Sequence, residues 1–190
     1  MKHLIPSMFS IFSILVLLQL CSARARPLSK SEPSLIRLKN IDLIENTCKS
    51  TSNYELCISV LKSDPRSLEA TDVDVLGLII VDEIKSKANS AMEIIKKLRI
   101  SSNPEFNVAL FECSIQYNAI LNADVPVAIE ALTKGVPKFA ESGMADAAVE
   151  AQGCENSFRV RGGSNSPLTD INQAVFDLSG IAKSIIKMLL

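Results

Sequence analysis

The stretch PKFAESGMADAAVEAQGCENSF, residues 137–158, repeats an apolar or small side chain every three or four positions. Such spacing places side chains on one face of an α-helix, whereas a half-buried β-strand alternates at every second residue. The residues on this face are Ala140, Met144, Ala147, Ala151, Cys154 and Phe158. The stretch therefore predicts a long helix whose alanine-rich face packs closely against neighbouring helices.

Three further segments between residues 72 and 190 have the same helical periodicity. One begins at Asp72, the next at Asn103-Pro104-Glu105, and the last at Ser166-Pro167 after a loop at 161–165. The middle one contains Pro126, where we expect a kink because proline lacks the N–H that a helix interior needs, and it stops at Gly135. Four long helices with short connections favour an up-down-up-down four-helix bundle.

A shorter helical region precedes the bundle at residues 35–62. The polar stretch Thr51-Ser52-Asn53 divides it into two short helices, and Asn53 is a plausible cap for the second. No run of alternating hydrophobicity suggests a β-sheet. The sequence thus predicts an all-α fold, a four-helix bundle at 72–190 with an N-terminal helical hairpin at 35–62.

The first 25 residues have the pattern of a secretory signal peptide. Lys2 and His3 precede an apolar run from Ile11 to Leu20, and Ala23-Arg24-Ala25 offers a cleavage site between small residues. Residues 26–190 then form a single domain, in which no segment has the roughly 20 uninterrupted apolar residues of a membrane helix. We expect a product of the secretory pathway that does not enter the bilayer.

Four of the five cysteines remain after the predicted cleavage, because Cys21 lies in the signal peptide. Four cysteines allow three pairings in an oxidising compartment. The turn-like stretch between Cys48 and Cys57 favours a bond between these two, which leaves Cys113 to pair with Cys154 on the next helix. No CxxC spacing occurs and the only histidine is His3, so we expect neither a metal site nor a cofactor.

Charge and residue types argue against nucleic-acid binding and against catalysis. Residues 26–190 carry 18 basic and 21 acidic side chains without blocks, whereas a nucleic-acid binder presents a basic stripe. The loss of His3 removes triads and metal sites that depend on histidine. Carboxylates such as Glu93, Glu130 and Glu141 are expected on outward faces, and Gly162-Gly163 follows a helix, unlike a phosphate-binding loop. We therefore do not expect an enzyme.

One site opposes the local rules of helix formation. The helix that opens at Pro137 has Val136 in place of a capping side chain, and Lys138 lies in the first turn, where the helix dipole disfavours a cation. Phe139 lies one position away from the inward face. Such departures mark candidate functional sites, although a kinked loop with a lysine that extends to solvent explains them as well.

The chain resembles the plant invertase and pectin methylesterase inhibitor family from about Leu35 to Leu190. The resemblance rests on NTC (46–48), NYELC (53–57), VDEIK (81–85), AIEAL (128–132), PKFAE (137–141) and AQGCE (151–155). It implies a four-helix bundle with an N-terminal helical hairpin and with disulfides Cys48–Cys57 and Cys113–Cys154. This is the architecture that periodicity already predicts.

Within that family, Pro137-Lys138-Phe139 is similar to the signature of invertase inhibitors. The resemblance implies that this motif enters the active-site cleft of a plant acid invertase, a β-fructofuranosidase, where Lys138 meets the catalytic carboxylates. Val136 stands where several relatives have aspartate. The final compartment is then the vacuole or the apoplast. Inhibition of pectin methylesterase is the alternative, because both groups share the cysteine framework, and a small secreted hydrolase is a third hypothesis.

Overall fold

The computed structural model describes residues 32–160 and 166–190, so the predicted signal peptide and the predicted loop at 161–165 lie outside the described residues. Residues Ile36–Leu190 form a compact unit, which carries the architecture described below. Its described residues are helical throughout, with no β-strand among them, as the periodicity predicts.

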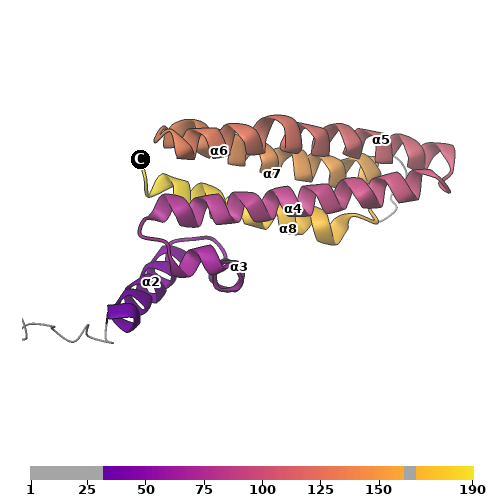
Figure 1. Cartoon of the computed structure of the whole chain (residues 1–190). Helices are drawn as coiled ribbons and strands as arrows, with labels where there is room; N and C mark the ends of the chain where they lie inside the picture. Colours follow the sequence, from indigo (N-terminus) through magenta and orange to yellow (C-terminus); the bar gives the residue numbers. More distant parts are fainter. Residues whose placement is uncertain (1–31, 161–165) are drawn as a thin grey trace, which may run out of the picture. The chain divides into compact units, whose positions relative to one another are not determined.

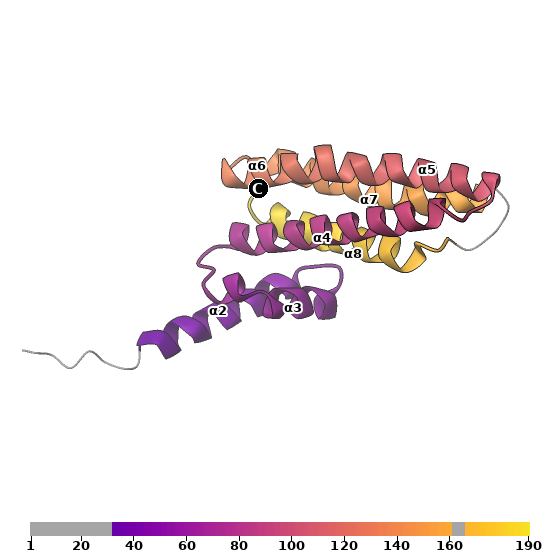
Figure 2. The ribbon, with the colours of Figure 1, turned by 45° about the vertical axis from the view of Figure 1, so that its right-hand side comes forward.

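The four-helix bundle begins with α4 (Val73–Arg99) and continues through α5 (Pro104–Ala119), a π-helical segment η2 (Ile120–Asp124) and α6 (Val125–Thr133). The last two helices are α7 (Pro137–Val160) and α8 (Thr169–Lys187). The path through α5, η2 and α6 forms one side of the bundle, antiparallel to α4 (Figures 1 and 2). Both α4 and α7 pack against α8 and against this path, which gives the predicted up-down-up-down arrangement.

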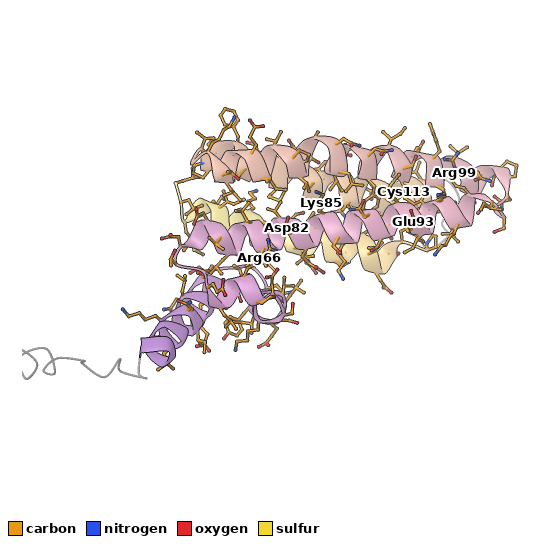
Figure 3. The ribbon with its side chains drawn as sticks, viewed as in Figure 1. Arg66, Asp82, Lys85, Glu93, Arg99 and Cys113 are labelled. Atoms are coloured by element: carbon orange, nitrogen blue, oxygen red, sulfur yellow. A yellow bond between two sulfur atoms is a disulfide. The ribbon has the colours of Figure 1, made fainter. Side chains whose placement is uncertain are left out.

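A helical hairpin precedes the bundle and consists of α2 (Glu32–Lys49) and α3 (Tyr54–Ser63). The Leu56 N–H donates to the Asn53 side chain at 3.2 Å, so Asn53 caps α3 as expected. A 3-10 turn, η1 (Pro65–Leu68), leads from α3 to α4. Its Arg66 donates to Asp82 of α4 at 2.7 Å, and Figure 3 shows the two side chains meeting between the hairpin and the bundle.

Two disulfide bonds connect these elements, Cys48–Cys57 in the hairpin and Cys113–Cys154 between α5 and α7. The second bond has a Cα–Cα distance of 4.4 Å, a close approach that is possible because Ala147 and Ala151 also lie on the buried face of α7. The core of the bundle therefore combines a covalent link with small side chains, as the alanine-rich stretch predicts.

The helical path continues past Pro126 because the turn before it is wider than an α-turn. The π-helical segment η2 ends at Asp124, and Pro126 lies in the first turn of α6, where a helix does not need the missing N–H. A further difference concerns α8, which begins at Thr169 without a side-chain cap. The Ser166 hydroxyl accepts a hydrogen bond from the Leu168 N–H before the helix starts.

Candidate functional site

The candidate motif follows a tight connection between α6 and α7. Gly135 has a φ of +68°, which glycine adopts without strain, and it ends α6. The Val136 N–H then donates to the Ala131 carbonyl at 2.8 Å, and the Gly135 N–H donates to the Leu132 carbonyl at 3.2 Å. These two bonds form a Schellman motif, so the backbone is already fixed where α7 begins.

The three residues of the motif occupy the first turn of α7. Pro137 is the first residue of the helix, where a fixed φ favours helix initiation. The Lys138 side chain is 72% exposed and Phe139 is 64% exposed, whereas Ala140 is completely buried. The start of the helix therefore presents a cation and an aromatic ring to solvent, and its next residue anchors it in the core.

Lys138 has a partner within its own helix. Its Nζ donates to Oε2 of Glu141 at 2.5 Å, and Nζ of Lys187 in α8 lies 3.7 Å from Oε1 of the same carboxylate. The hydrogen bond from Lys138 is the main cause that lowers the pKa of Glu141, and the charges of Lys187 and Lys183 act in the same direction. The negatively charged Glu141 carboxylate therefore interacts with three lysines, Lys138, Lys183 and Lys187.

The expectation that Glu141 points outward was wrong. Its side chain is only 11% exposed, because the face of α7 that carries it packs against α8 near Lys187. Glu93 and Glu130 are exposed as expected. The position of Glu141 three residues after Lys138 is a familiar signal for a helical ion pair, but sequence alone does not show which helix covers that side.

A group of acidic side chains interacts at the end of the π-helical segment. Asp124 is buried, and its Oδ2 has no hydrogen-bond partner. Burial, together with the negative charges of Asp146 and Glu150, raises the pKa of Asp124 to about 6. Nothing in the sequence analysis singled out this carboxylate.

Neither a metal centre nor a membrane-spanning helix is found in the described part of the chain. Within residues 32–160 and 166–190, no group of three or more His, Cys, Asp or Glu side chains could hold a metal ion. None of the helices in these two ranges has the length and apolar character needed to cross a bilayer.

Comparison with known proteins identifies related sequences and a related fold. Residues 42–185 match the family model described as plant invertase/pectin methylesterase inhibitor. "Cell wall / vacuolar inhibitor of fructosidase 1" from Arabidopsis thaliana is 46% identical over 143 residues, which are 75% of this chain and 67% of that protein. "Pectinesterase inhibitor 5" from the same plant is 33% identical over 144 residues, 73% of this chain and 78% of that protein.

A solved structure shares the architecture. A mutant form of a pectin methylesterase inhibitor from Arabidopsis superposes with a TM-score of 0.67 at 18% identity, and the match covers 77% of this chain and 97% of that one. At this identity the likeness concerns the fold.

Proposed function

The chain belongs to the plant invertase/pectin methylesterase inhibitor family, and from this premise we propose that it inhibits plant acid invertase. The family and the relatives are inhibitors, so the chain is an enzyme inhibitor and not an enzyme. The observation that carries the choice of target is the exposed Pro137-Lys138-Phe139 turn on a fixed backbone. The 46% identity with an inhibitor of fructosidase supports the same choice.

The proposed mechanism is occlusion of the active-site cleft. Glycosidases of this kind use a pair of carboxylates, and a cation that enters the cleft forms charge-assisted hydrogen bonds with them. Lys138 supplies the cation and Phe139 adds an apolar contact beside it. Pro137 and the Schellman motif before it fix the backbone, so little conformational entropy is lost on binding.

The proposed compartments are the vacuole and the apoplast, which fit the name of the inhibitor from Arabidopsis. The two disulfides suit an oxidising secretory route, and a signal peptide at residues 1–25 would direct the chain there. The partner is then an acid invertase, and we propose no nucleic-acid partner.

Inhibition of pectin methylesterase is the second candidate. The observation that favours it is the 33% identity to a pectinesterase inhibitor. A side-by-side assay of the purified protein against vacuolar invertase, cell-wall invertase and pectin methylesterase separates the two. Inhibition of pectin methylesterase alone would refute the invertase proposal.

Variants of the motif test the proposed contact. Lys138→Ala should weaken invertase inhibition by about 2 kcal/mol or more, as expected for a binding hot spot, and Lys138→Glu should weaken it further by repulsion. Phe139→Ala should have a smaller effect. Lys134→Ala is the matched control, because Lys134 is also an exposed lysine paired with a carboxylate of its own helix, Glu130, but lies outside the motif. A Lys138→Glu protein that inhibits like the parent would place the binding surface on other helices.

A further inference from the structure

Two lysines from different helices meet on one largely buried carboxylate. Lys138 from the first turn of α7 and Lys187 from the last turn of α8 lie 2.5 Å and 3.7 Å from the two oxygens of Glu141. The Glu141 side chain is 11% exposed, but the lysine side chains are 72% and 56% exposed. The Lys138 ammonium group is thus held by a hydrogen bond, the Lys187 ammonium group lies beside the same carboxylate, and both are accessible from the outside.

The charges at this point do not balance. Glu141 carries one negative charge, and the positive charges of Lys138, Lys187 and Lys183 all act on it. The Glu141 site therefore presents an excess of positive charge to an approaching partner.

The end of α8 repeats the chemistry of the motif. Phe139, which follows Lys138, is 64% exposed, and Met188, which follows Lys187, is 40% exposed. Each of the two segments therefore offers a cation followed by an exposed apolar side chain. A cation next to an apolar side chain on a fixed backbone is a combination that binds acidic pockets well.

We propose that Lys187 is a second cationic contact with the target and that Glu141 positions both ammonium groups. The inference rests on the proposed function and extends its binding surface from Lys138-Phe139 to Lys187-Met188. The chemistry recognised is a pair of carboxylates, which glycosidases hold roughly 5 to 9.5 Å apart. Lys138 and Lys187 approach different oxygens of Glu141, so the site presents two separate ammonium groups to such a pair. In the complex Lys138 meets one carboxylate of the target and Lys187 meets the other.

The test compares Lys187 with a lysine in an equivalent helical position. Lys97 lies in the last turn of α4 and is exposed, and this end of α4 is at the opposite end of the bundle from the connection between α6 and α7 (Figure 1), so Lys97→Ala and Lys97→Glu are matched controls. Lys187→Ala should raise the Kd for acid invertase at least ~5-fold and Lys187→Glu more, with larger effects at low salt. The Lys97 variants should stay within about twofold, and melting curves should confirm that all four variants fold.

Glu141→Gln tests the positioning role through rates. The substitution removes a negative charge, so association with an acidic cleft should become faster, while the unfixed lysines should make dissociation faster. A merely structural role would lower the amount of folded protein without changing either rate. An unchanged dissociation rate would overturn the positioning role.

The outcomes for Lys187 distinguish this inference from the proposed function. A parent protein that inhibits invertase, together with Lys187→Glu that inhibits equally well, would overturn the second contact and leave the proposed function intact. A parent protein without effect on invertase would overturn both.

Discussion

Replacing Asp124 by asparagine should stabilise the fold at neutral pH and remove part of its pH dependence. Asp124 ends the π-helical segment, where its carboxyl group is buried and Oδ2 lacks a hydrogen-bond partner. Burial raises the pKa of this carboxyl from its ordinary value of 3.8 to about 6, with Asp146 and Glu150 acting in the same direction. The folded state therefore binds the proton more tightly than the unfolded state.

The sign and the size of the effect follow from this difference. Below pH 3.8 Asp124 is protonated in both the folded and the unfolded state, so its burial carries no cost of charging and the fold keeps its full stability. Between pH 3.8 and about 6 the unfolded state loses its proton first, so stability falls as pH rises and then levels off. A difference of one pKa unit between the folded and unfolded states corresponds to about 1.36 kcal/mol. Allowing for the partial solvation of Asp124, we expect the free energy of unfolding to fall by about 1 to 3 kcal/mol as the pH rises.

Thermal unfolding at pH 4.5 and pH 7.5 measures this contribution. Asp124→Asn should raise the melting temperature at pH 7.5 by about 2 to 4 °C per kcal/mol and change it less at pH 4.5. Asp42→Asn is the matched control, because Asp42 is exposed in α2 and its replacement should not alter the difference between the two pH values. Equal pH dependence in Asp124→Asn and the parent would refute the argument from burial.

Three further predictions concern stability and are checked by thermal or denaturant unfolding. Replacing Cys113 and Cys154 together by serine should cost about 3 to 4 kcal/mol, because the bond spans 41 residues. Tyr117→Phe should cost about 1 kcal/mol, because the buried Tyr117 hydroxyl donates to Asn172 at 2.7 Å, and equal stability would contradict this. Gly143→Ala should destabilise by about 1 to 3 kcal/mol, because a Cβ would lie 2.7 Å from the Asp124 carbonyl oxygen. Gly153→Ala is its control in the same helix, since there a Cβ would meet only the flexible Gln116 side chain.

Hydrophobic periodicity predicts most of the fold because it reports which side of each helix is buried. The inward residues of α7, from Ala140 to Phe158, are all buried as their spacing predicts. Periodicity does not report small changes in helical geometry. It predicts that the helical path continues past Pro126, which the structure confirms, but it does not predict the π-helical segment that precedes the proline.

The candidate site was only partly predictable, for a related reason. Val136 and Lys138 could be singled out because they oppose rules that depend on neighbours in the sequence. The burial of Glu141 depends on α8, whose last turn reaches it from more than 40 residues away along the chain. A rule based on local sequence cannot find such a contact, whereas an antiparallel pairing of α7 with α8 places Lys187 next to the start of α7.

The first turns of α7 are positioned by contacts with the π-helical segment and with α8. Affinity for the target and stability of the fold should therefore respond differently to substitutions here. At Gly143 the helix approaches the Asp124 carbonyl so closely that no Cβ fits, and at Glu141 it meets Lys187 of α8. The backbone that carries Lys138 is therefore positioned by packing that does not involve the Lys138 side chain. A substitution at Gly143 should displace this backbone and so lower stability and the proposed inhibition together. A substitution at Lys138 should leave the packing intact, so under the proposed function its effect should fall on the contact with the target.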